Sequence, residues 1–132
     1  ADFIGETNFL DGVLENDGER FAVTTPWGRL AAAEAPPGLQ GPVRVSVRPE
    51  ALRLLDHQEH AVNVLTCRAL DTVYLGETAR HTLEAAGGAD TPPLRLKLFE
   101  LNPRRGRLPQ GETLRLTVDP EDVVVLSSDD DA

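Results

Sequence analysis

The stretch that decides the fold is Val43-Arg44-Val45-Ser46-Val47-Arg48-Pro49-Glu50, in which aliphatic and polar residues alternate until a Pro-Glu pair ends the run. A period of two places the aliphatic side chains on one face and the polar ones on the other, as a half-buried β-strand requires. The pattern returns 71 positions later as Leu114-Arg115-Leu116-Thr117-Val118-Asp119-Pro120-Glu121. Because proline keeps the preceding residue out of the α region, both strands are predicted to end at the same kind of corner.

Another block at the same offset indicates an internal duplication. Phe3-Ile4-Gly5-Glu6-Thr7 resembles Tyr74-Leu75-Gly76-Glu77-Thr78 position for position. Two blocks at one spacing indicate two copies of a β unit of about 50 residues, the size of a small Greek-key barrel. The alternative is that any strand followed by Pro-Glu looks alike. We expect a first barrel over residues 1–60, a second over residues 61–127 and a disordered acidic tail over residues 128–132.

Short strands and tight turns are predicted along the rest of the chain. Eleven glycines and ten prolines interrupt it at short intervals, which disfavours long helices. Residues 94–98 alternate with period two, Asn16-Asp17-Gly18 is typical of a hairpin turn, and Thr25-Pro26-Trp27-Gly28 of a second turn. The sequence therefore predicts an all-β protein of two tandem barrels, the first being either cut short or completed by a strand exchanged from elsewhere in the chain.

Composition excludes several classes of protein. The 132 residues include 13 Lys and Arg against 22 Asp and Glu, a net charge of −9 that argues against a duplex DNA binder. The single cysteine, Cys67, excludes an internal disulfide framework. No apolar run approaches the roughly 20 residues of a membrane-spanning helix. Since the sequence has no methionine, we expect it to be a piece of a longer protein.

No catalytic or cofactor-binding residue is predicted. A phosphate-binding P-loop needs a glycine-rich turn followed by Gly-Lys-Ser/Thr, whereas the one lysine, Lys97, lies inside a predicted strand. Cys67 lies in an apolar strand and is typical of a buried small residue rather than a nucleophile. The fragment is therefore not expected to be an enzyme.

No metal site is predicted either. His57 and His60 are three positions apart, which is a formal ligand spacing, but His81 lies in another predicted strand. A solvated linker is the more frequent explanation for such a pair. The basic cluster at residues 102–107 is most simply a solvated hairpin tip, and Trp27 is either an exposed contact or a cap over a barrel mouth.

Four motifs, in order and at the usual spacing, resemble a known family. They are Phe3-Ile4-Gly5-Glu6-Thr7-Asn8-Phe9-Leu10, Val47-Arg48-Pro49-Glu50, Val73-Tyr74-Leu75-Gly76 and Asp119-Pro120-Glu121-Asp122-Val123-Val124-Val125-Leu126. Together they resemble the C-terminal regulatory region of the ATPase subunit of bacterial ABC importers, which carries the transport-associated OB module called TOBE. The residues of the first and third motifs are most similar to the polyamine (spermidine and putrescine) branch of the family. Importers of iron(III), sulfate and sugar or glycerol-phosphate are close relatives.

The resemblance implies two OB-like barrels that serve as a non-catalytic regulatory and dimerisation domain. ATP and Mg²⁺ would be bound by an N-terminal nucleotide-binding domain that this sequence lacks, so no cofactor is expected here. The implied partners are a second copy of the subunit, that nucleotide-binding domain and, indirectly, the transmembrane permease subunits, at the cytoplasmic face of the bacterial membrane. In some relatives this region also receives a signal from a small oxyanion, a partner protein or the transported substrate.

The two Pro-Glu corners are the candidate interface residues. They comprise Arg48, Pro49, Glu50, Asp119, Pro120 and Glu121. An arginine and a glutamate two residues apart could pair reciprocally across a two-fold axis, although plain strand termination explains the same pattern. The competing function is a stand-alone OB-type module that binds a small anion or single-stranded nucleic acid. Nucleic acid would require a basic groove with stacking aromatics, which one lysine and a charge of −9 disfavour.

Overall fold

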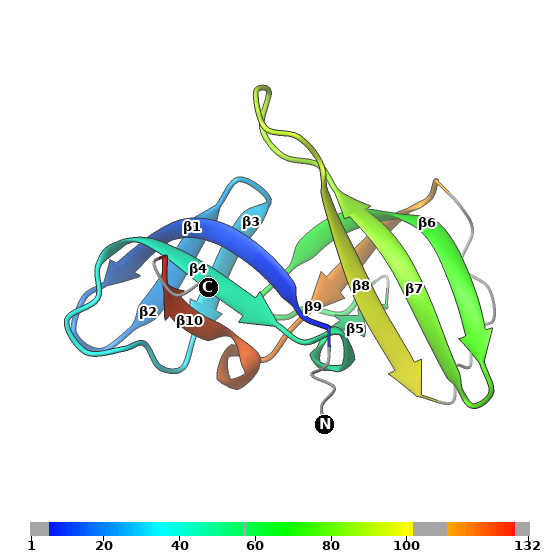
Figure 1. Ribbon diagram of the computed structural model, residues 1–132, viewed down its shortest axis with the longest axis horizontal. Helices are drawn as coiled ribbons and strands as arrows, with labels where there is room; N and C mark the ends of the chain where they lie inside the picture. Colours follow the sequence, from blue (N-terminus) through cyan, green and yellow to red (C-terminus); the bar gives the residue numbers. More distant parts are fainter. Residues whose placement is uncertain (1–5, 57, 102–110, 129–132) are drawn as a thin grey trace.

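The computed structural model describes residues 6–56, 58–101 and 111–128, which form two five-stranded sheets (Figure 1). In chain order the elements are β1 (Asn8–Asn16), β2 (Phe21–Thr25), β3 (Gly28–Ala32), β4 (Gly41–Val47), the 3-10 turn η1 (Pro49–Ala51), β5 (Arg53–Leu54), β6 (Leu65–Leu75), β7 (Thr78–Ala85), β8 (Leu94–Leu101), β9 (Thr113–Thr117), the 3-10 turn η2 (Pro120–Asp122) and β10 (Val124–Ser127). No α-helix occurs in these described ranges, and none of their helical turns is long and apolar enough to cross a membrane. The expected all-β class is confirmed.

The two sheets have the same internal arrangement. The first sheet has the order β10-β4-β1-β2-β3 and the second the order β5-β9-β6-β7-β8, with every neighbouring pair antiparallel. β4 is thus the counterpart of β9, and β1 is the counterpart of β6. Each sheet is an OB-like unit, so the expected pair of OB-like units is confirmed.

The sheets exchange one short strand each. β5 follows β4 in the chain but pairs with β9, and β10 follows β9 but pairs with β4 of the first sheet. The crossings occur at η1 and η2, where Pro49 and Pro120 begin a 3-10 turn and redirect the chain. The exchange considered from sequence is therefore present. The limits of residues 1–60 and 61–127 for the two units stay a prediction.

The duplication is confirmed in one block and wrong in the other. The strand–corner–strand segments β4-η1-β5 and β9-η2-β10 are equivalent in topology, as the alternating runs predicted. Residues 74–78, however, end β6, form a turn and begin β7, whereas residue 8 begins β1, the counterpart of β6. The likeness of residues 3–7 to residues 74–78 therefore does not mark equivalent positions; residues 3–5 lie outside the described residues.

Local turn chemistry agrees with the sequence. The β1–β2 hairpin turns at Gly18, whose φ of +95° suits glycine, and the Asp17 carboxylate accepts the backbone N–H groups of Glu19 and Arg20 at 3.0 and 2.7 Å. These bonds from the backbone lower the pKa of Asp17 below its usual value. The β2–β3 hairpin turns at the predicted second turn. Its Trp27 is half buried, and the indole Nε1 donates to the carbonyl of Pro92 at 3.3 Å, across to the β7–β8 loop.

The buried side chains of both sheets form one continuous cluster. Leu10, Val23 and Val45 of the first sheet belong to the same cluster as Leu83 and Leu116 of the second, all almost fully buried. Aliphatic burial of this kind is the main favourable term in folding. The two units therefore share a core and stabilise each other.

The predicted barrels are not closed by backbone pairing. β3 and β8 are edge strands in the hydrogen-bonded order, and two buried asparagines occupy their free edges instead. Asn63 accepts the N–H of Ala31 on β3 at 2.7 Å, and its Nδ2 donates to the carbonyls of Ala31 and Val118 at 3.0 and 2.9 Å. A primary amide carries the donor and acceptor of a peptide group, so Asn63 substitutes for a strand.

Asn8 makes the matching contact in the second sheet. Its side chain accepts the N–H of Lys97 on β8 at 2.8 Å and donates to the Lys97 carbonyl at 2.9 Å. Asn8 begins β1 of the first sheet, and Asn63 lies just before β6 of the second. Each asparagine therefore ties one sheet to the edge of the other, and the signal in the sequence is the shared Asn-x-Leu of residues 8–10 and 63–65.

Replacing Asn63 by alanine should destabilise the fold by about 3 kcal/mol, because it leaves one N–H and two carbonyls without their partner in a buried place. The Asn16→Ala variant removes a single exposed bond to Gly18 and should cost less than about 1 kcal/mol. Urea denaturation followed by circular dichroism measures both. Equal losses in the two variants would show that Asn63 does not carry the contact between the sheets.

Cys67 is expected to resist alkylation in the native chain. Its side chain is buried in β6, and burial raises the pKa of the thiol to about 12, so the reactive thiolate is scarce at neutral pH. Labelling with a thiol reagent at pH 8 should proceed only after denaturation. Rapid labelling of the folded chain would contradict this placement.

Candidate functional site

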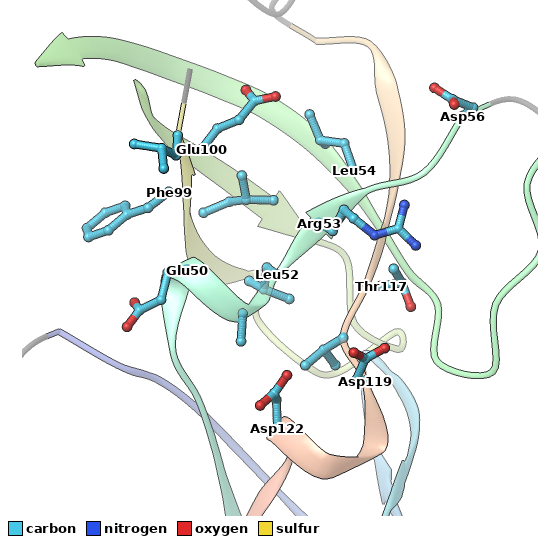
Figure 2. Close-up of a pocket in the computed structure, with 14 residues that line it drawn as sticks. Glu50, Leu52, Arg53, Leu54, Asp56, Phe99, Glu100, Thr117, Asp119 and Asp122 are labelled. Carbon is cyan, nitrogen blue, oxygen red and sulfur yellow. The ribbon is translucent and has the colours of Figure 1, made fainter. Parts of the chain in front are cut away.

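A cavity of about 550 Å³ lies where η1 and β5 cross from the first sheet to the second (Figure 2). Its walls come from three separate segments: η1 with β5, the end of β8, and the end of β9 with η2. The strand exchange creates the cavity, because it brings η1 beside β8, a strand far from it in sequence.

Acidic side chains dominate the rim of the cavity. They are Glu50, Asp56, Glu100, Asp119 and Asp122. Among the described lining residues Arg53 is the one cationic side chain, and its guanidinium lies 2.8 Å from the Glu59 carboxylate. Figure 2 shows Asp119 and Asp122 on one side of the cavity and Glu100 on the opposite side. The cavity therefore has negative electrostatic character and suits a cation.

The floor of the cavity is apolar. Leu52, Leu54 and Leu98 are buried there. The Phe99 side chain lies on the face of β8 opposite to Glu100 and points away from the cavity (Figure 2). A cavity with an apolar floor and a few polar groups is the usual form of a small-molecule site. The lining therefore suits an organic cation with methylene groups better than a bare metal ion.

Glu100 is held in place from behind by a buried histidine. The Nε2 atom of His81 lies 2.9 Å from a Glu100 carboxylate oxygen, and its Nδ1 atom lies 2.8 Å from the Thr72 hydroxyl. His81 is fully buried, whereas the Glu100 side chain remains partly exposed. The chain Thr72–His81–Glu100 therefore fixes the direction of one cavity carboxylate.

The structure brings some of the predicted corner residues together. Glu50 and Asp119, from the two Pro-Glu corners, line the same cavity. Arg48 and Glu50 form an exposed ion pair at 3.9 Å within one chain. Glu121 faces a different hollow beside β10, and the carbonyl of Pro120 accepts the N–H of Ala33 at 3.0 Å. A role for these residues between subunits stays a prediction.

Sequence reasoning missed Asp56, Phe99 and Glu100, since Asp56 follows β5 and the other two lie on β8, and the sequence does not show that these segments are neighbours. Of the possible metal pair His57 and His60, His57 lies outside the described residues, as does the basic cluster at residues 102–107. No group of three or more potential metal ligands occurs in the part of the chain that the structure describes.

Comparison with known proteins places this fold in a family. The family model described as TOBE domain matches residues 45–126. Among curated proteins, the spermidine/putrescine import ATP-binding protein PotA of Rubrobacter xylanophilus is 34% identical over 96% of this chain and 33% of its own length. PotA 1 of Pseudomonas aeruginosa is 39% identical over 67% of this chain and 24% of its own. The chain thus spans about a third or less of the curated relatives it matches.

A solved structure shares the fold. The cytoplasmic molybdate-binding protein ModG, in a form with molybdate bound, superposes with a TM-score of 0.67 over 96% of this chain and 99% of its own, at 14% sequence identity. At that identity the likeness establishes the fold alone. Because the TOBE domain model matches more than half of its residues, this chain, with its two exchanged OB-like sheets, belongs to the TOBE domain family.

Proposed function

We propose that this chain is a non-catalytic regulatory and dimerisation domain of the ATPase subunit of an ABC importer for polyamines. Support comes from the TOBE match and from curated relatives that are named as spermidine/putrescine import ATP-binding proteins. The observation that carries the polyamine part of the proposal is the acidic cavity with its apolar floor.

The proposed chemistry of the cavity is recognition of a flexible chain of ammonium groups. Polyamines carry positive charges separated by methylene segments, so carboxylates such as Glu100 and Asp119 on separate walls would pair with the charges. The methylene segments would lie over Leu52 and Leu54. Charge-assisted hydrogen bonds of this kind are among the stronger polar contacts. Binding there would let the domain sense the transported substrate and report it to the ATPase.

The remaining parts of the proposal concern partners and place. ATP and Mg²⁺ would bind to a nucleotide-binding domain outside this chain, and the subunit would pair with a second copy at the cytoplasmic face of the membrane, touching the permease indirectly. The corner residues Arg48, Pro49, Glu50, Asp119, Pro120 and Glu121 are proposed as interface candidates. A shared core makes the domain a stiff support, because packed cores do not deform continuously.

Spermidine should bind the chain at the cavity. The Asp119→Asn/Asp122→Asn variant should bind it at least about tenfold more weakly, because two charge partners are lost. Both side chains are exposed, and Asp119 makes no side-chain capping bond to η2, so folding should persist. Isothermal titration calorimetry measures the affinities.

The matched control is Glu19→Gln/Glu77→Gln, which removes the same charge from exposed turns outside the cavity. It should bind spermidine as the wild type does. Equal weakening in both double variants would mean that spermidine responds to the net charge of −9 and not to the cavity.

ATP hydrolysis is expected of the full ATPase subunit but not of this chain alone. Released phosphate should stay at background with this chain alone, since its single lysine lies inside β8 and not in a P-loop. The full ATPase subunit should hydrolyse ATP, and spermidine should change its rate only while the cavity carboxylates are intact. Turnover by the chain alone would contradict the non-catalytic role.

A further inference from the structure

The outer face of the first sheet is the feature from which we infer more. On β1, β4 and β10 the side chains that point away from the core include Phe9, Val13, Pro42, Val124 and Leu126. Phe9, Val13 and Val124 are 46%, 51% and 49% exposed. Apolar side chains that gather on one face and stay exposed in this way mark an interaction site.

The register arranges this face in rows. Val124 and Phe9 lie on either side of Ser46 in one row, and Val13 lies opposite Pro42 in another. Between them runs a row with the Arg44–Asp11 ion pair, whose Nε–Oδ1 distance is 2.8 Å. The Arg44 guanidinium also lies 5.3 Å from the centre of the Phe9 ring. An apolar row therefore flanks the charged row on each side.

The charges of the face are balanced, although the chain as a whole is strongly acidic. Asp11 pairs with Arg44, and Glu15 pairs with Arg29 at 3.2 Å, so the four charges sum to zero. Two chains of net charge −9 repel each other over most of their surface. A neutral face whose ions are already paired can be covered without leaving an unpaired buried charge.

We propose that a second copy of this chain docks on the outer face of the first sheet. A two-fold axis that passes between Arg44 and Asp11 sets apolar rows against apolar rows and brings each Arg44 beside the partner's Asp11, as an isologous contact requires. A strongly basic partner would instead meet the acidic cavity, which is a separate surface. The inference rests on the proposed dimerisation and places the contact on the sheet face, which borders the two Pro-Glu corners at Val124 and Phe9.

The test compares single substitutions in the whole 132-residue chain, whose two sheets share one core. Val13→Arg and Val124→Arg should each weaken self-association at least about tenfold, because each variant places an unpaired charge in an apolar row of the contact. Arginine lowers the net negative charge, so mutual repulsion decreases and cannot explain a loss. The matched control is Leu75→Arg, at a site 54% exposed on the second sheet. Sedimentation equilibrium measures association, and circular dichroism checks the fold.

Association of the wild type and of Leu75→Arg, together with loss in both face variants, supports the inference. If all variants associate equally, or if Glu50→Arg alone abolishes association, the sheet face is not the contact and the inference is overturned while dimerisation stands. A wild-type chain that stays monomeric overturns the contact as well. The effect of spermidine on ATP hydrolysis is measured separately, so the result of the association experiment does not decide the regulatory proposal. Val124 lies on an edge strand, so Val124→Arg should stay folded and its association can be measured even if Val13→Arg unfolds.

Discussion

Two buried side-chain amides join the two sheets at their edge strands. Each OB-like sheet ends in a strand whose backbone lacks a neighbouring strand, and unpaired backbone groups in a buried place cost free energy comparable to a lost hydrogen bond. Asn63 and Asn8 satisfy the backbone groups of Ala31 on β3 and Lys97 on β8 and, in doing so, connect each sheet to the other. Together with the exchanged strands β5 and β10 and the shared core, this pair of contacts fixes the relative position of the sheets.

The cavity follows from that fixed position. β5 and β10 change sheets at two proline corners, so η1 comes to lie beside β8, and carboxylates from distant segments gather at one place. The His81–Glu100 contact shows how far the organisation extends into the second sheet. In a rigid frame of this kind, a ligand bound in the small cavity can shift the position of whole elements that contact a neighbouring domain, because packed elements move as units.

The distribution of charge separates two surfaces. Much of the acidic excess lies at the cavity, whereas the outer face of the first sheet pairs its ions internally. The cavity suits a small cation, and the sheet face suits a surface like itself.

The sequence by itself determined the all-β class, the alternating strands, the turns at residues 16–18 and 25–28, and the equivalence of the two proline corners. These features are local, because period-two alternation and turn chemistry act over a few residues. Tertiary structure alone decided that β1 corresponds to β6, that asparagine amides take the place of barrel closure, and that Glu100 and Phe99 share a cavity with Glu50. Such contacts join residues far apart in the chain, and which strand lies beside which is set by burial of the common core rather than by any short run of residues.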